Sequence, residues 1–190
     1  MPRVIHPENL GTLARGLCAE AEVKSPRPVI LIDGRSGSGK STLADVMREC
    51  WPGRVTLVRL DDIYPGWDGL EQGARHVAEW VLNPETPRWQ QWDWEANKPL
   101  RWRTIDESEP LIVEGCGALS RASAPRATVR IWLELDAESR KRRALARDGQ
   151  AYEPFWDRWA AQEREFLAAE NPVELADVSV DMSSVDLAAR

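Results

Sequence analysis

The sequence predicts a three-layer α/β fold, in which a parallel sheet lies between two layers of helices. Short apolar runs alternate with longer stretches whose apolar residues recur at helical spacing. This alternation is typical of parallel sheets, because a parallel connection needs a crossover, which is usually a helix. The chain has 190 residues, enough for one α/β domain with a substantial core. We therefore expect residues 1–190 to form a single domain.

The N-terminal segment, residues 1–25, is predicted to carry a helix over residues 8–22. Four apolar side chains share one face of that helix, namely Leu10, Leu13, Leu17 and Ala21. Residues 24–28 then break the pattern ahead of the first strand. The run Val29–Ile32 is apolar throughout, as expected of a parallel strand that is buried on both faces.

A second helix is predicted over residues 39–50, because Leu43, Val46 and Met47 recur at helical spacing. Three further strands are indicated over residues 54–60, 111–114 and 129–135, with a weaker one over 176–180. Helices are expected between the strands over residues 70–82, 136–148 and 154–170. The pattern therefore predicts five strands with helices on both faces of the sheet.

Composition limits the class of protein. The net charge of −6 argues against a general nucleic-acid binder, which is usually basic. The three cysteines show no paired spacing and no metal motif, and we interpret them as reduced thiols in a cytoplasmic protein. The first residues lack the apolar stretch of a secretory signal, and no run approaches the roughly 18 apolar residues of a membrane span. We expect neither a nucleic acid nor a membrane as a partner.

Residues 34–42, Gly-Arg-Ser-Gly-Ser-Gly-Lys-Ser-Thr, follow the first strand and complete the pattern of a phosphate-binding loop. In such a loop, backbone N–H groups turn inward around a polyphosphate, and glycines leave room for its approach. Lys40 would bring a positive charge to the β- and γ-phosphates, and the Ser41 hydroxyl would ligate Mg²⁺. The residues predicted to bind the nucleotide are Gly34, Ser36, Gly37, Ser38, Gly39, Lys40, Ser41 and Thr42.

Two acids, Asp61 and Asp62, directly follow the second strand. A carboxylate at this strand end would face the phosphate loop, because parallel sheets bind ligands at the carboxyl ends of their strands. It would there take the proton of an attacking hydroxyl or hold Mg²⁺ through water. A helix cap or a turn is the alternative role. We expect at least one of the two acids to be catalytic.

Glu114 ends the third strand and precedes Gly115. An acid after an apolar run is the usual form of a second nucleotide-binding signature, in which it fixes Mg²⁺ or the water shell of the ion. The alternative is an ordinary acid at a strand end. The adjacent glycine favours a functional role, because it permits a close approach of backbone.

Arg140, Arg143 and Arg147 form one stripe on the predicted helix 136–148 through their three- and four-residue spacing. Converging guanidinium groups suit the charge that a γ-phosphate carries during transfer. A solvated basic face paired with nearby acids is the alternative. Because the chain has a phosphate loop, we predict an arginine lid over residues 140–153, with a hinge at residues 149–151.

These stretches together resemble the uridine kinase and phosphoribulokinase group of P-loop kinases, over about residues 27–182. The resemblance rests on the phosphate loop, on Asp61-Asp62-Ile63-Tyr64 and on the pair Glu114-Gly115. The lid pattern Arg-x-x-Arg-x-x-x-Arg-Asp matches residues 140–148, and Trp92-Asp93-Trp94 is similar to a short substrate segment of the group. The resemblance implies five parallel strands in the order 2-3-1-4-5.

The resemblance also implies ATP- and Mg²⁺-dependent phosphorylation of a hydroxyl group on a small molecule. Asp61 takes the position of the catalytic acid of the group. The implied catalytic residues are Asp61, Lys40, Arg143 and Arg147, and the implied metal ligands are Ser41, Glu114 and Asp61. The residues predicted to contact the acceptor are Asp62, Tyr64, Trp92, Asp93 and Trp94.

Residues 65–105 are predicted to be a substrate-binding insertion rich in tryptophan. Trp92 and Trp94 flank Asp93, so an apolar platform would surround a carboxylate that accepts hydrogen bonds from hydroxyls. Packing of these tryptophans within the insertion is the alternative. Residues 95–98, Glu-Ala-Asn-Lys, stand where the group has a histidine-bearing segment, so the resemblance does not extend to uridine or cytidine as the acceptor.

A small-molecule kinase is therefore the leading hypothesis. An ATP-binding regulatory switch without an acceptor is the second; guanine specificity is unsupported, because Asn97-Lys98-Pro99-Leu100 lacks the final Asp of a guanine-reading motif. The third is a nucleoside monophosphate kinase, whose acceptor phosphate would need the arginines Arg75, Arg88, Arg101 and Arg103. The sequence leaves the acceptor and the oligomeric state open, and it is compatible with a homodimer.

Overall fold

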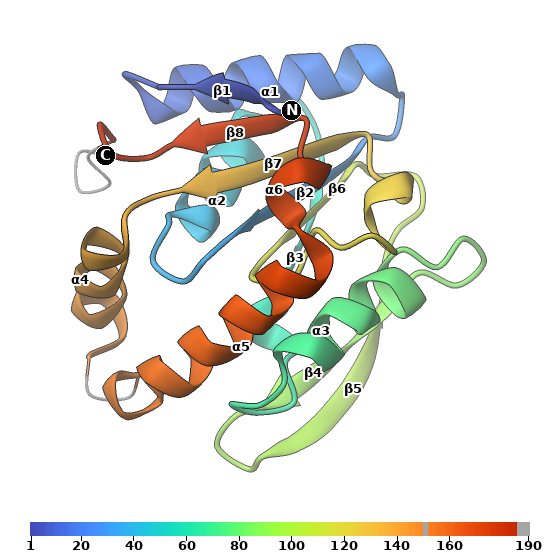
Figure 1. Cartoon of the computed structure of the whole chain (residues 1–190). Helices are drawn as coiled ribbons and strands as arrows, with labels where there is room; N and C mark the ends of the chain where they lie inside the picture. The colour runs from blue at the N-terminus through green and yellow to red at the C-terminus, as the bar shows by residue number, and fades with distance from the viewer. Residues whose placement is uncertain (150–151, 186–190) are drawn as a thin grey trace.

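A computed structural model describes residues 1–149 and 152–185 and has a six-stranded parallel sheet at its centre (Figure 1). The strands are β1 Arg3–Ile5, β2 Val29–Gly34, β3 Thr56–Arg59, β6 Leu111–Glu114, β7 Val129–Glu134 and β8 Val178–Asp181. Their order is β1-β8-β7-β2-β6-β3, and every neighbouring pair is parallel. The carboxyl ends of all these strands therefore lie along one edge, where parallel sheets bind ligands.

The predicted order 2-3-1-4-5 is confirmed for β3, β6, β2, β7 and β8. The prediction of five strands is wrong by one, because Arg3–Ile5 adds a sixth strand beside β8. In this pairing Arg3 lies opposite Val178, and Ile5 lies opposite Val180. A strand of three residues at the sheet edge is too short to show an apolar alternation, so the sequence pattern did not reveal it.

Helices cover both faces of the sheet (Figure 1). One face carries α1 Leu10–Lys24 and α2 Lys40–Cys50, and the other carries α3 Leu70–His76 and α5 Trp156–Glu170. The side chains of β2 alternate between two cores, since Ile30 and Ile32 pack with α1 and α2 whereas Leu31 packs with α3 and α5. Burial on both faces explains why this strand reads as an unbroken apolar run.

The remaining helical elements are short, apart from α4. They are α4 Ala137–Asp148, α6 Pro172–Leu175, a π-helical turn Val77–Val81 that extends α3, and 3₁₀ turns at Leu60–Asp62, Ala124–Arg126 and Glu153–Phe155. All five predicted helices are present, with ends within two residues of the predicted ones. Within the described residues, no helix is both long and apolar enough to cross a membrane.

The predicted insertion, residues 65–105, contains an antiparallel hairpin that the sequence pattern did not reveal. Its strands are β4 Arg88–Asp93 and β5 Lys98–Thr104. The Arg88 guanidinium lies over the Trp102 ring at 4.5 Å and over the Trp80 ring at 5.0 Å. These cation–π contacts bind the hairpin to the end of the α3 segment. Most of β5 is exposed, so its side chains lack the apolar alternation that marks a half-buried strand.

Candidate functional site

The phosphate-binding loop connects β2 to α2, as the sequence predicts. Gly39 precedes the first residue of α2 with a φ of 100°, and no side chain caps this helix N-terminus. The backbone N–H groups of the first turn therefore remain suited to an anion. Gly37 has a φ of 81°, and a Cβ there would lie 2.1 Å from the carbonyl oxygen of Arg140. Only glycine fits at this position, because both the backbone conformation and the space exclude a side chain.

Lys40 lies beneath the loop and is only 8% exposed. Its Nζ donates to the carbonyl oxygen of Arg35 at 3.2 Å and lies 3.5 Å from Cys116 Sγ. Burial acts to lower the pKa of this ammonium, but the surrounding groups outweigh it and raise the pKa. Those groups are Cys116, Glu114, Glu163 and Asp33. Lys40 therefore carries the charge that a polyphosphate requires.

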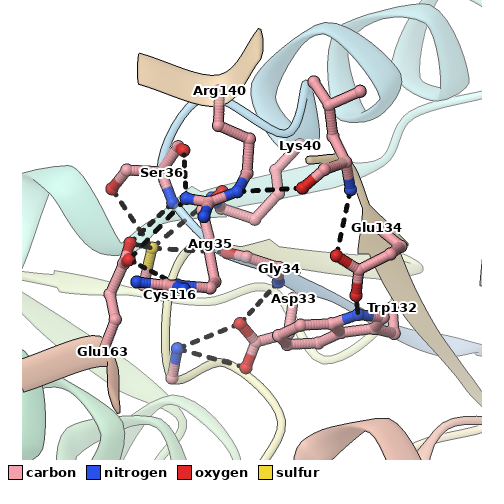
Figure 2. A network of polar contacts seen from close by, with 12 residues as sticks. Asp33, Gly34, Arg35, Ser36, Lys40, Cys116, Trp132, Glu134, Arg140 and Glu163 are labelled. Atoms are coloured by element: carbon pink, nitrogen blue, oxygen red, sulfur yellow. Dashed lines mark hydrogen bonds and ion pairs between the residues drawn. The ribbon is translucent and has the colours of Figure 1, made fainter. Parts of the chain in front are cut away.

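Glu163 of α5 holds the loop through its buried carboxylate (Figure 2). The carboxylate accepts a hydrogen bond from the Ser36 backbone N–H at 2.6 Å and pairs with the Arg35 guanidinium at 2.9 Å. Burial acts to raise its pKa, but the Ser36 bond and the Lys40 charge lower it below the ordinary value. Glu163 thus stays ionised at 3% exposure. The sequence gave no signal for this role, because Glu163 reads as one more acid on a helix.

Arg140 supports the same loop from α4. Its Nε donates to the Leu135 carbonyl at 3.0 Å, and its Nη1 donates to the Ser36 carbonyl at 3.2 Å (Figure 2). The guanidinium also lies 4.0 Å from the Glu163 carboxylate. Although Arg140 belongs to the predicted stripe, it is buried against the loop, whereas Arg143 and Arg147 line the neighbouring cavity.

Asp33 is a second buried acid that the sequence analysis did not single out. Its carboxylate accepts N–H groups from Gly34 at 2.6 Å, from Gly117 at 3.1 Å and from Leu119 at 2.8 Å. Burial raises its pKa to about 6, against the effect of these hydrogen bonds. Asp33 therefore ties the phosphate loop to the segment that follows β6 (Figure 2). Its position inside an apolar strand is the one sequence signal that would have indicated it.

The residues predicted to hold Mg²⁺ fit that role. Glu114 is buried, and its Oε1 has no hydrogen-bond partner, although Arg59 Nε lies 3.4 Å away. Burial, followed by the charge of Asp61, raises the pKa of Glu114 to about 7. A buried carboxylate oxygen without a donor, near the Ser41 hydroxyl and a second carboxylate, matches Mg²⁺, which is usually bound by one or two carboxylates plus phosphate oxygens.

A cavity of about 870 Å³ brings most of the predicted residues together. The predicted residues that line it are Ser36, Gly37, Gly39, Lys40, Ser41, Thr42, Asp61, Tyr64, Trp94, Glu114, Arg143 and Arg147. Gly34, Ser38, Asp62, Trp92 and Asp93 are not among its lining residues. Asp93 instead accepts N–H groups from Glu95 and Ala96 at the hairpin turn, at 3.1 and 2.9 Å. The acceptor roles of Asp62, Trp92 and Asp93 stay predictions.

The arginine side of the cavity comes from α4. Arg143 donates from Nη2 to the Val185 carbonyl at 2.8 Å, while its Nη1 is buried without a hydrogen-bond partner. Arg147 is exposed and also lines the cavity. Residues 150 and 151 of the predicted lid and hinge lie outside the described residues. The structure therefore places both predicted catalytic arginines at the cavity, one buried at its edge and one exposed.

Three aromatic residues of the cavity were not predicted as site residues. Trp67 lies in the loop after β3, Tyr152 precedes α5, and Trp159 lies within α5. The Trp67 and Trp159 ring centroids are 6.3 Å apart, although the residues are far apart in the chain. No sequence pattern links such distant residues, so only the packing of α5 against the β3 loop reveals the group.

The strand order and the GxxxxGKS loop between the central strand and α2 define a P-loop kinase fold. Neither a scan against protein-family models nor a search of curated proteins finds a match. Solved structures do match. A possible uridine kinase from Bacillus stearothermophilus has a TM-score of 0.64 at 20% identity, with 90% of this chain and 99% of the other covered.

A proposed fructose transport system kinase from Silicibacter sp. TM1040 has a TM-score of 0.62, also at 20% identity. That comparison covers 90% of this chain and 98% of the other. The chain therefore shares nearly its whole fold with these two P-loop kinases. Because four-fifths of the aligned residues differ, the likeness establishes the fold, and the chemistry must be argued from the site itself.

Proposed function

We propose that the chain is an ATP-dependent kinase that phosphorylates a hydroxyl group of a small molecule. One observation carries the proposal: a single cavity joins the phosphate loop, Lys40, the carboxylates Asp61 and Glu114, and the arginines of α4. The names of the two structural neighbours, both kinases, support the same class of reaction. Three free cysteines support a reducing, cytoplasmic location.

In the proposed reaction the acceptor oxygen attacks the γ-phosphorus of ATP. The new oxygen–phosphorus bond forms as the bond between the γ-phosphorus and the bridging oxygen breaks, and ADP leaves with that electron pair. Asp61 accepts the hydroxyl proton. Lys40, Arg143 and Arg147 neutralise the charge that spreads over the γ-phosphate oxygens.

Ser41 and Glu114 would hold Mg²⁺, with Asp61 acting through water. The ion, when bound, neutralises phosphate charge. Every other part of the proposal rests on protein groups: the loop amides and Lys40 bind the polyphosphate, and the walls of the cavity exclude water.

A nucleoside monophosphate kinase lacks comparable support. Its acceptor phosphate needs cations in the cavity beyond those of the nucleotide site, and Arg75, Arg88, Arg101 and Arg103 are not among the lining residues. Arg88 and Arg103 are engaged with the hairpin tryptophans, with Arg103 lying 5.4 Å from the Trp89 ring centroid. A regulatory switch remains an outcome of the test below.

We expect Lys40→Ala and Asp61→Asn to abolish phosphoryl transfer while the fold is retained. Loss of the general base alone typically lowers rate by about 10²–10⁴-fold. The measurement is ATP consumption with a panel of nucleosides, sugars, amino alcohols and phosphorylated acceptors, together with mass spectrometry for metabolites that gain a phosphate.

Lys24→Ala, on the exposed end of α1, is the matched control and should keep full activity. Full turnover by Asp61→Asn would remove Asp61 from the base role. ATP hydrolysis that no acceptor stimulates would favour the switch, and failure of the wild-type chain to bind ATP·Mg²⁺ would overturn the kinase itself.

A further inference from the structure

The cavity has an aromatic wall that the phosphoryl-transfer chemistry does not use. Its five rings are Tyr64, Trp67, Trp94, Tyr152 and Trp159, which come from the β3 loop, the hairpin turn and the α5 region. Trp67 is central to the wall, because its ring stacks on Phe155 at 4.3 Å and lies 5.0 Å from the Trp94 ring. We call these five residues the aromatic wall.

The rings are inclined to one another and form no parallel slot across the cavity. The Trp67 and Trp159 planes meet at 85°, the Tyr64 and Trp159 planes at 68°, and the Trp67 and Trp94 planes at 57°. Neighbouring centroids are 4.7–6.3 Å apart along these contacts, so the rings touch each other and leave no gap for a flat ligand between them. A wall of this shape suits a rounded group that meets several rings at once.

The polar atoms of the wall are largely occupied within the protein. The Tyr64 hydroxyl donates to the Cys116 carbonyl at 2.7 Å, and the Trp94 indole N–H donates to the Asp61 carbonyl at 2.8 Å. These residues therefore offer ring carbon to a ligand. A polyhydroxylated acceptor would lose its hydrogen bonds to water without replacement, which argues against a sugar at this wall.

The charge next to the wall is negative. Asp61 lines the same cavity, its side chain is exposed, and its backbone carbonyl is joined to Trp94. Asp62 follows it in the 3₁₀ turn. Inclined aromatic faces beside a carboxylate form the arrangement that attracts a cation, because the ring quadrupole is negative on its face.

We propose that the aromatic wall binds the cationic nitrogen of an amino alcohol, with a quaternary ammonium group preferred, and that the hydroxyl of the same molecule is the phosphate acceptor. The inference rests on the proposed kinase function for its second half. A quaternary nitrogen needs no hydrogen-bond partner, which matches a wall whose polar atoms are already bonded.

The sharpest test compares choline with 3,3-dimethylbutan-1-ol, its neutral isostere. Both carry a primary hydroxyl and a group of the same shape, so a difference between them reports the charge. We expect choline to bind at least tenfold more tightly by isothermal titration with AMP-PNP and Mg²⁺ present, and to stimulate ATP consumption where the isostere does not.

Equal or tighter binding of the neutral isostere would overturn the cation site, and so would absence of choline binding to a protein that binds AMP-PNP. Choline binding without phosphorylation of choline, together with acceptor-independent hydrolysis, would instead keep the cation site and overturn the kinase. The two proposals can therefore fail separately.

Two tryptophans of one hairpin region supply matched variants. Trp94→Leu removes a wall ring and should reduce the preference for choline over the isostere at least threefold. Trp102→Leu removes a tryptophan of similar exposure, 41% against 39%, that is not among the cavity-lining residues, and should leave the preference unchanged. An equal loss in both variants would indicate a structural effect on the hairpin and would count against the wall.

Discussion

Asp33 illustrates how a single buried carboxylate organises this site. Three backbone N–H groups, from Gly34, Gly117 and Leu119, converge on it, so one side chain orders both the phosphate loop and the segment after β6. Burial nevertheless raises its pKa to about 6, from an ordinary value of 3.8. Ionised Asp33 therefore costs stability relative to the unfolded chain, in which water solvates the charge.

The sign of this effect gives a pH prediction. Below pH about 4 the carboxyl is protonated in both states and the cost is absent; it grows as the pH rises and is complete above about 6. We expect the free energy of unfolding of the wild type to fall, relative to Asp33→Asn, by about 3 kcal/mol across that window, at about 1.4 kcal/mol per pKa unit.

Urea unfolding of both proteins at several pH values between 4 and 6.5 measures this difference. Asp157→Asn, at an exposed position, serves as the control and should run parallel to the wild type. Parallel curves for the wild type and Asp33→Asn would contradict the prediction.

Helix α5 shows at the element scale how one helix serves both halves of the cavity. Trp159 contributes a ring to the aromatic wall, and Glu163, one turn later on the same face, holds the phosphate loop. Gln162 donates to the Trp67 carbonyl at 2.7 Å and accepts from the Leu70 N–H at 3.3 Å, which fixes the loop carrying Trp67. The position of α5 therefore sets both the loop and the wall.

We expect Glu163→Gln to weaken binding of AMP-PNP·Mg²⁺ about tenfold, the equivalent of about 1.4 kcal/mol, because the loop loses its preformed conformation. The variant also leaves buried arginine charge uncompensated, which typically costs 3–5 kcal/mol of folding stability. Calorimetric titration and urea unfolding measure the two effects.

Glu165→Gln, at an exposed position of the same helix, is the control and should change neither quantity. If Glu163→Gln binds the nucleotide as tightly as the wild type, the loop does not depend on α5 and the assignment of Glu163 fails.

At the scale of the whole molecule, the nucleotide site lies at the carboxyl edge of a sheet that is buried on both faces. The loop follows β2, Asp61 follows β3, and Glu114 ends β6, so three adjacent strands of the sheet supply the site. A ligand that binds these strand ends binds only the folded chain, and its binding energy therefore adds to the stability of the fold.

We expect AMP-PNP with Mg²⁺ at 100 times its Kd to add about 2.7 kcal/mol to the free energy of unfolding, which corresponds to an increase in Tm of about 5–11 °C for a chain of this size. Glu114→Gln should lose the part of this gain that depends on Mg²⁺, because it removes a ligand charge. Differential scanning fluorimetry with and without EDTA measures both.

Glu138→Gln, whose side chain is 90% exposed, provides the control and should respond like the wild type. An EDTA-insensitive Tm gain in the wild type would contradict the predicted magnesium site.

Most of the sheet and all five predicted helices followed from the sequence, because each rests on a local pattern of apolar residues. The sixth strand and the hairpin did not follow, because Arg3–Ile5 is too short and β5 is too exposed to carry such a pattern. For the site, the loop residues and the strand-end acids were predicted from their places next to apolar runs. Arg140 was assigned to a stripe by spacing, but its burial against Ser36 depends on how α4 packs.

The phosphate loop was determined by the sequence alone, because contiguous residues supply its glycines, its lysine and its hydroxyl, and local backbone geometry fixes how they act. The aromatic wall and the Glu163 support were decided only by the tertiary structure. Their members lie on the β3 loop, the hairpin and α5, and only packing of α3 and α5 against the sheet brings these distant segments to one cavity.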